Sequence, residues 1–169
     1  MRQEHEILPA LQAGFIVIAD RYMYTAFARN AVMGADAQWT RRLFGFAVVP
    51  DLVLYLKIDV RRLIPRVLES KGMDYWESGM HLKLGGDIFD SFRRYQTRLI
   101  REYDAVAEEF DFATVDASRP IEAIQQDLRG HIGRYLEGER PQTGRRRGAT
   151  VRRIARSGAG LRASRTRPR

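Results

Sequence analysis

The fold of this chain can be predicted from residues 14–22, which read Gly-Phe-Ile-Val-Ile-Ala-Asp-Arg-Tyr. Residues 15–19 form a short apolar run that follows a turn glycine and ends at Asp20 and Arg21. A short β-branched run of this kind predicts a strand that is buried on both faces of a parallel sheet. Ligands of open α/β sheets bind just beyond the carboxyl ends of the strands, so Asp20 and Arg21 are candidate site residues.

Two interpretations of the corner formed by Asp20 and Arg21 are open. An arginine at this place can bind a phosphate through two parallel hydrogen bonds, and an aspartate can orient that arginine or hold water bound to Mg²⁺. Alternatively, the two residues form a surface pair that closes the strand and binds nothing. The residue types at the corner do not decide between a ligand site and a surface pair.

Composition and charge indicate one globular domain followed by a basic tail. The chain has 169 residues, of which 44% are hydrophobic and 30% are charged, as is ordinary for a globular protein. The net charge of +8 is unevenly distributed, because 11 arginines and no acidic residue follow Glu139. We expect a domain over residues 1–137 and a disordered, arginine-rich tail over residues 138–169, which has too few apolar residues to fold.

Two origins of the basic tail are open. A run of arginines binds polyanions in a salt-dependent manner, so nucleic acid is a candidate partner of the tail. Alternatively, a segment rich in arginine, glycine, alanine, serine and proline arises when a GC-rich gene is read past a frameshift. The first origin gives the tail a role in binding, and the second gives it none.

The residue types that are rare or absent exclude several kinds of site. The chain has no cysteine, which excludes disulfides, thiolate zinc sites and cysteine nucleophiles. Its three histidines are far apart in the sequence, which argues against a histidine metal site. No apolar stretch approaches the roughly 20 residues of a membrane span, and the first residues lack the apolar core of a signal peptide. We expect a cytoplasmic protein that does not enter a membrane.

Helical and strand patterns alternate along the chain. Helices are predicted at residues 2–13, 23–33, 36–49, 60–70, 87–110 and 118–132, and further strands at residues 52–58 and 112–115. A helix that leads directly into a buried strand resembles the return half of a βαβ crossover whose first strand is missing. The order of the elements predicts an α/β fold with parallel pairing.

Apolar stripes predict which helix faces are buried, because residues three and four apart lie on one face of a helix. The stripe of the helix at 87–110 consists of Phe89, Phe92, Gln96, Leu99, Tyr103, Val106 and Phe110. The inward stripe of the last helix consists of Ile121, Ile124, Leu128 and Ile132. The helix that Asp36 caps carries a stripe of Trp39, Leu43 and Phe46.

Residues 71–86 form a long loop that glycines interrupt. Long loops in compact domains are usually lids or binding loops. The alternative, a disordered insertion, fits less well with the adjacent aromatic residues Tyr75 and Trp76. We therefore expect this loop to be a lid.

The corner and its neighbours resemble a known family. Asp20-Arg21-Tyr22, followed by Thr25 and Ala28, resembles the Asp-Arg-Tyr-x-x-Ser-x-x-Ala motif of bacterial thymidylate kinases. Other segments within residues 4–133 agree with that family in order and spacing, namely Leu8-Pro9-Ala10-Leu11-x-x-Gly14, Trp39, Pro50-Asp51-Leu52 and Val115-Asp116-Ala117-Ser118. The resemblance identifies the chain as similar to the P-loop nucleoside monophosphate kinases.

The resemblance implies transfer of the γ-phosphate of ATP to dTMP with Mg²⁺, and assembly as a homodimer. The implied catalytic residues are Asp20, which approaches the metal through water, and Arg21, which holds the acceptor phosphate. The implied substrate-binding residues are Arg21, Tyr22, Thr25, Phe27 and Arg29, of which Tyr22 and Phe27 would line the nucleoside pocket. The lid cations would be Lys71 and Lys83, and the turn that holds the adenine of ATP would be Asp116, Ala117 and Ser118.

The chain departs from the family's pattern in three respects. The phosphate-binding loop Gly-x-x-x-x-Gly-Lys-Ser/Thr, whose amides and lysine hold nucleotide phosphates, is absent from the sequence. The predicted lid contains lysines but no arginine. Ala26 and Arg29 stand where typical members have a base-reading polar residue and a tyrosine that crowds the 2′ position of the sugar, so the accepted base is open.

From these features we expect a partial P-loop NTPase-type parallel sheet flanked by helices, without its first strand and phosphate loop. The expected activity of a complete protein is phosphorylation of dTMP or a related deoxynucleoside monophosphate, and this chain alone is expected to have little or none. The alternative hypothesis is a non-catalytic module, derived from a kinase fold, that binds nucleotides or nucleic acid.

Overall fold

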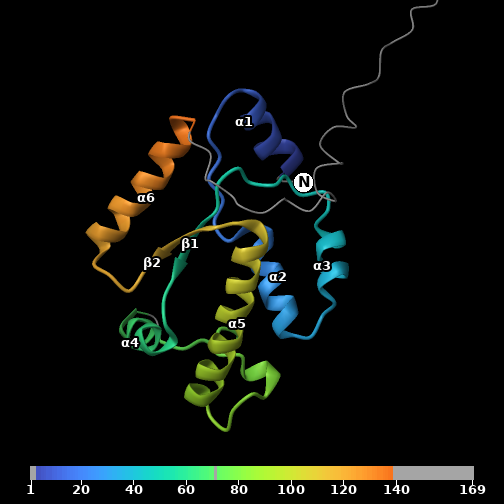
Figure 1. Ribbon diagram of the computed structural model, residues 1–169. Helices are drawn as coiled ribbons and strands as arrows, with labels where there is room; N and C mark the ends of the chain where they lie inside the picture. The colour runs from blue at the N-terminus through green and yellow to red at the C-terminus, as the bar shows by residue number, and fades with distance from the viewer. Residues whose placement is uncertain (1–2, 71, 139–169) are drawn as a thin grey trace, which may run out of the picture.

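The computed structural model describes residues 3–70 and 72–138 of the chain. Two strands form one small parallel sheet beside a long central helix, and shorter helices surround them (Figure 1). The elements are η1 (Gln3–Ile7), α1 (Leu8–Gln12), α2 (Tyr22–Val32), α3 (Ala37–Leu43), β1 (Leu54–Lys57), α4 (Val60–Ser70), η2 (Met80–Leu82), α5 (Ile88–Phe110), β2 (Ala113–Asp116) and α6 (Ile121–Leu136). The α/β class that the sequence predicts is confirmed for the described residues.

Strands β1 and β2 are paired in parallel, with Leu54 opposite Ala113 and Lys57 opposite Asp116. The backbone N–H of Ala113 donates to the carbonyl of Val53 at 2.9 Å, which fixes this register at the start of both strands. Because parallel strands end at the same edge of a sheet, the turns that follow β1 and β2 lie side by side. Two of the three strands predicted from the sequence are therefore present in the described part of the chain.

The third predicted strand, at residues 15–19, is wrong for the described structure. No strand is formed there, and the side chains of Phe15, Ile16 and Ile18 are 68%, 71% and 90% exposed. A strand needs a neighbour that pairs with its backbone, and within the described residues β1 and β2 pair only with each other. The apolar run has the composition of a buried strand but lacks, in this part of the chain, the partners that would bury it.

The core lies where α2 packs against α5 (Figure 1). One buried cluster consists of Met23, Tyr24, Phe27 and Val106, and a second consists of Ala28, Tyr95 and Leu99. The ring of Tyr24 also contacts that of Phe112 in an edge-to-face arrangement, with 4.7 Å between the ring centres. Because Phe112 immediately precedes β2, this contact joins the helical core to the sheet.

Two aspartates begin helices, as the sequence predicts. At the start of α3 the carboxylate of Asp36 accepts the N–H of Trp39 at 2.6 Å, and at the start of α5 that of Asp87 accepts the N–H of Asp90 at 2.8 Å. Each bond satisfies a backbone donor that the first turn of a helix leaves unpaired. Gly34, with a φ of 82°, lies just beyond the end of α2, where a left-handed residue ends a helix most easily.

The apolar stripes are only partly buried. In α5 the predicted stripe is buried at Phe92, Leu99 and Val106, but Phe89 is 53% exposed, so its inward placement is wrong. In α6 no residue is fully buried: Ile124 and Leu128 of the predicted stripe are half-buried, whereas Ile121 is 72% exposed, so the inward placement of Ile121 is wrong. Periodicity identifies the apolar face of a helix, but burial needs a neighbouring element, and α6 packs mainly against β2.

The helix that Asp36 caps is shorter than predicted and exposes its stripe. It ends at Leu43, and turns cover residues 44–46, so the expected extension to Pro50 is wrong. The stripe residues Trp39, Leu43 and Phe46 are each at least half exposed. Exposed apolar side chains that gather into a patch often mark a place where another molecule or segment packs.

Nearly all of the predicted basic tail, residues 139–169, lies outside the described residues. The division of the chain at residue 137 therefore stays a prediction. Within residues 3–70 and 72–138, no helix is both long and apolar enough to cross a membrane.

Candidate functional site

The corner at Asp20 and Arg21 is a strained turn. The backbone N–H of Tyr22 donates to the carbonyl of Asp20 at 2.7 Å, which closes a three-residue γ-turn around Arg21. Arg21 has a φ of 64° and a ψ of −50°, and Tyr22 has a φ of 48°. Non-glycine residues in such conformations cost about 1–3 kcal/mol each and concentrate at functional sites. The side chains of Asp20 and Arg21 are exposed at this corner, directly before α2.

A polar stripe continues from the corner along α2. Thr25 and Arg29 are four residues apart on one face of α2, and Arg21 lies just before the helix with a φ of 64°. The hydroxyl of Thr25 donates to the carbonyl of Arg21 at 3.2 Å and accepts a hydrogen bond from the Tyr103 hydroxyl of α5 at 3.1 Å. The predicted residues Thr25 and Arg29 are therefore on the side of α2 that meets α5, whereas Arg21 precedes the helix, is exposed and is joined to Thr25 through its backbone carbonyl.

The charge of Arg29 acts on a second tyrosine of α5, Tyr95. Burial raises the pKa of the Tyr95 hydroxyl, and the positive charge of Arg29 acts in the opposite direction. The Nε atom of Arg29 is buried and has no hydrogen-bond partner among the described residues. An arginine donor that is left without a partner in a folded domain is suited to a polar ligand group.

The turn Asp116–Ala117–Ser118 lies at the carboxyl end of β2. The carboxylate of Asp116 accepts the backbone N–H of Ser118 at 2.8 Å, and the carbonyl of Ala117 accepts a hydrogen bond from Arg66 of α4 at 2.7 Å. Hydrogen bonds from Ser118 and then the charges of Arg119 and Arg62 lower the pKa of Asp116. This turn is thus an ordered, charged element, and it is separate in the chain from the corner before α2.

The predicted lid is a folded segment that α5 holds in place. The buried hydroxyl of Ser91 donates to the carbonyl of Ser78 at 2.9 Å, and the side-chain amide of Gln96 donates to the carbonyl of Glu77 at 2.9 Å. These bonds disagree with the alternative of a disordered insertion for the described part of the loop, residues 72–86. Lys83 is exposed in the turn after η2, whereas Lys71 lies outside the described residues.

Comparison with known proteins assigns the family. A family model described as thymidylate kinase matches residues 2–128. The chain belongs to the thymidylate kinase family. It is similar to probable thymidylate kinase 2 of Saccharolobus solfataricus, with 36% identity over 80% of this chain and 65% of that protein. It is also similar to a probable thymidylate kinase of Thermococcus gammatolerans, with 35% identity over 78% of this chain and 59% of that protein. The chain spans less than two thirds of the length of these two relatives.

Two residues that the thymidylate kinase resemblance assigns to the nucleoside pocket take part in packing. Tyr22 is half-buried, and its hydroxyl donates to the side-chain carbonyl of Gln3 at 3.2 Å. Phe27 is 5% exposed, lies against Phe110 and has the guanidinium of Arg41 above its ring, 5.4 Å from the ring centre. Contact of Tyr22 or Phe27 with a nucleoside stays a prediction.

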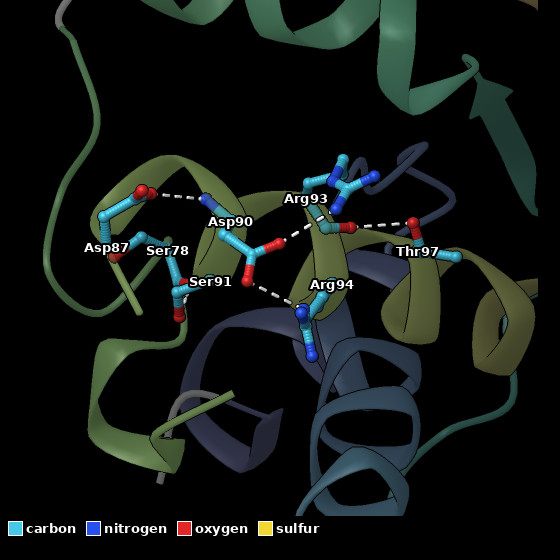
Figure 2. A network of polar contacts seen from close by, with 7 residues as sticks. All are labelled: Ser78, Asp87, Asp90, Ser91, Arg93, Arg94 and Thr97. Carbon is cyan, nitrogen blue, oxygen red and sulfur yellow. Dashed lines mark hydrogen bonds and ion pairs between the residues drawn. The ribbon is translucent and has the colours of Figure 1, made fainter. Parts of the chain in front are cut away.

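An arginine pair near the start of α5 was not predicted from the sequence of this thymidylate kinase family member. Figure 2 shows the Asp90 carboxylate between the guanidinium groups of Arg93 and Arg94, each 2.9 Å away. Hydrogen bonds from Arg93 and then Arg94 lower the pKa of Asp90. The i,i+3 and i,i+4 spacing of these residues on the helix that Asp87 caps was the available signal in the sequence. The predicted lid contains no arginine, but two arginines lie near the start of the helix that follows it.

The substitution Asp90→Asn is expected to destabilise the protein at neutral pH and to have no effect in acid. In the folded state the arginines lower the pKa of Asp90 below the ordinary value of 3.8, so its ionised form stabilises the fold above that pH. This contribution is lost as the pH falls through the lowered pKa. We expect the difference in free energy of unfolding between wild type and variant, measured with urea, to disappear with acidification.

The change at Asp90 has a matched control in Asp51→Asn, at an exposed position before β1. High salt should reduce the Asp90 effect, because the ion pairs lie at the surface. A difference between wild type and Asp90→Asn that stays constant from neutral to acidic pH would contradict the assigned ion pairs.

Proposed function

We propose that the chain forms the acceptor-binding part of a nucleoside monophosphate kinase that transfers the γ-phosphate of ATP to dTMP or a related deoxynucleoside monophosphate. The observation that carries the proposal is the exposed Arg21 guanidinium at a strained corner, continued along α2 by Thr25 and Arg29, in a member of the thymidylate kinase family. A two-pronged arginine fits the oxygens of a monophosphate. The strained corner supports this role because the fold fixes the position of the arginine.

In this proposal each polar residue of the corner has a separate task. Arg21 donates to two oxygens of the acceptor phosphate and offsets its charge. Thr25 holds the backbone of Arg21, and Arg29 offers its unpartnered Nε to the nucleoside. Phosphoryl transfer depends mostly on such positioning and charge neutralisation. Arg29 stands where typical members have the tyrosine that crowds the 2′ position of the sugar. The proposal therefore specifies the phosphate of the substrate more firmly than its base or its sugar.

The described residues are suited to Mg²⁺ only when the ion arrives bound to the phosphates of a nucleotide. Within the described residues no group of three or more side chains could hold a metal by itself, and the exposed carboxylate of Asp20 lies beside Arg21. Mg²⁺ keeps several of its waters and is typically bound through one or two carboxylates and substrate phosphates. Asp20 would therefore accept hydrogen bonds from water on an ion that neutralises phosphate charge.

The fit to ATP is incomplete in this sequence. The ordered turn at 116–118 could receive an adenine, and Lys83 could approach phosphates from the lid. However, the sequence contains no Gly-x-x-x-x-Gly-Lys-Ser/Thr, so its residues do not supply a loop for the donor phosphates. We accordingly propose that this chain by itself binds the acceptor and has little or no kinase activity. The absent loop also keeps the alternative, a non-catalytic nucleotide-binding module, as a second candidate.

The 169-residue chain is expected to bind dTMP more tightly than thymidine, because only dTMP carries the phosphate that Arg21 would hold. Isothermal titration calorimetry with both compounds, and with the other deoxynucleoside monophosphates, measures the preference for phosphate and base. An assay of nucleoside diphosphate formation from ATP and dTMP measures the activity of the chain. Equal affinity for dTMP and thymidine, or no binding of any monophosphate, would reject the acceptor site, and sustained turnover would reject the proposed inactivity.

Assembly as a homodimer and a cytoplasmic location stay predictions for this chain. The exposed side chains of Trp39 and Leu43 on α3, and of Phe46 in the turns that follow it, support an interface, since these apolar side chains lose contact with water only when something covers them. Binding of nucleic acid by the tail concerns residues outside the described part of the chain.

A further inference from the structure

The strained corner needs support from outside its own turn. Arg21 and Tyr22 both have positive φ values of 64° and 48°, and the γ-turn hydrogen bond between Tyr22 and Asp20 is a single local contact. Strained residues persist only where surrounding groups hold them in place. The carbonyl of Arg21 is held by the hydroxyl of Thr25, one helical turn further along.

A hydrogen-bond chain of fixed direction joins this corner to α5. A carbonyl only accepts hydrogen bonds, so the single proton of Thr25 is donated to Arg21. The Thr25 oxygen must then accept, and the Tyr103 hydroxyl donates to it at 3.1 Å, across 78 residues of sequence. Successive hydroxyl donors of this kind polarise and strengthen one another. Tyr103 is therefore the first donor of a chain that ends at the backbone of Arg21.

The ring of Tyr103 is itself fixed against the sheet. It stacks on Tyr55 of β1, with 5.7 Å between ring centres and 28° between ring planes. Burial and then the negative charge of Asp104 raise the pKa of Tyr55, so this hydroxyl keeps its proton. Asp104 also accepts a hydrogen bond from Lys57 of β1 at 2.8 Å. The sheet and α5 together thus determine where the Tyr103 hydroxyl lies.

We propose that Tyr103 is a positioning residue for the acceptor phosphate, which acts through Thr25 on the backbone of Arg21. This inference rests on the proposed function of Arg21 as the residue that binds that phosphate. Tyr103 itself is not required to touch the nucleotide. Its hydroxyl sets the direction in which the Arg21 side chain leaves the corner, and therefore the affinity for the phosphate group rather than for the nucleoside.

The substitution Tyr103→Phe removes the hydroxyl and keeps the ring that stacks on Tyr55. Loss of one neutral hydrogen bond should weaken dTMP binding by the 169-residue chain roughly three- to tenfold. The affinity for thymidine, which has no phosphate, should not change. Calorimetric titration of wild type and variant with both compounds gives the two ratios, and Tyr135→Phe on α6 is the matched control that removes a hydroxyl elsewhere.

Variants of Thr25 test the route of the effect. Thr25→Val should weaken dTMP binding as Tyr103→Phe does, and the double variant should be no weaker than Thr25→Val alone, because both changes break one chain. Thr25→Ser keeps a hydroxyl and should retain affinity close to that of wild type. Additive losses in the double variant, or equal losses for dTMP and thymidine, would overturn the positioning role.

Hydrogen exchange of the free protein separates this inference from the proposed function. The amide of Tyr22 closes the γ-turn, so it should exchange several-fold faster in Tyr103→Phe than in wild type, as followed by NMR without nucleotide. If the Tyr22 amide exchanges faster in Tyr103→Phe but the wild-type protein binds no monophosphate, Tyr103 supports the corner and the acceptor site is rejected. Unchanged exchange of Tyr22 would overturn the support itself.

Discussion

Replacing Arg21 with alanine is expected to weaken dTMP binding by about 1.5–3 kcal/mol, on the order of ten- to 150-fold in Kd. This is the range for hydrogen bonds to a charged group, and the exposed guanidinium of Arg21 would make two of them to one phosphate. Alanine keeps the Cβ atom, so the backbone strain at a φ of 64° is the same in both proteins. Calorimetric titration of the chain with dTMP measures the loss.

Two further variants identify what the Arg21 side chain supplies. Arg21→Lys keeps the charge but loses the planar, two-pronged donor, so it should restore only part of the affinity. Arg42→Ala removes a guanidinium from an exposed position at the end of α3 and should leave binding unchanged. An Arg21→Ala variant that binds dTMP as wild type does would remove Arg21 from the proposed role.

Features that depend on neighbouring residues in the sequence could be predicted. The caps at Asp36 and Asp87 use a side chain and an amide three residues away, so a short pattern contains both partners. The same holds for α4, whose predicted range of 60–70 is the range found. The corner of the chain at Asp20 and Arg21 was also predicted, because charged residues end an apolar run there, whereas the role of these two residues in a site stays a prediction.

Features that depend on distant partners could not be predicted. Residues 15–19 have the composition of a buried strand, but pairing requires a neighbour that no local pattern specifies. The bond between Tyr103 and Thr25 joins α5 to α2, and the periodicity of α5 indicated only that Tyr103 faces the core. The γ-turn at Arg21 carries no glycine, so its strained φ left no signal in the sequence. In each case the contact that determines the structure is not contained in the short stretch of sequence from which the pattern is read.

The contact between Gly79 and Tyr95 gives the prediction with the largest effect on stability. Gly79 has a φ of 68°, and a Cβ atom added there would lie 2.6 Å from the Cβ and Cγ atoms of Tyr95, a buried residue of α5. Gly79→Ala should therefore lower the free energy of unfolding by about 2–4 kcal/mol, the sum of an unfavourable backbone conformation and an overpacked contact. Urea unfolding at neutral pH measures the change in free energy. The dependence of that free energy on urea concentration, the slope m, should be compared between the two proteins.

The matched control is Gly86→Ala, in the same loop, where an added Cβ atom meets nothing within 4 Å. This variant should have nearly the stability of wild type, so that the difference between the two measures the combined cost of the backbone conformation and of the contact with α5 at Gly79. Equal stability of both variants would show that the loop at residues 72–86 does not press on Tyr95. If Gly79→Ala is destabilised and also binds dTMP less tightly, the displaced Tyr95 connects the two effects, because the charge of Arg29 acts on the hydroxyl of that tyrosine. The packing of the loop at residues 72–86 on α5 would then influence the proposed site through Arg29.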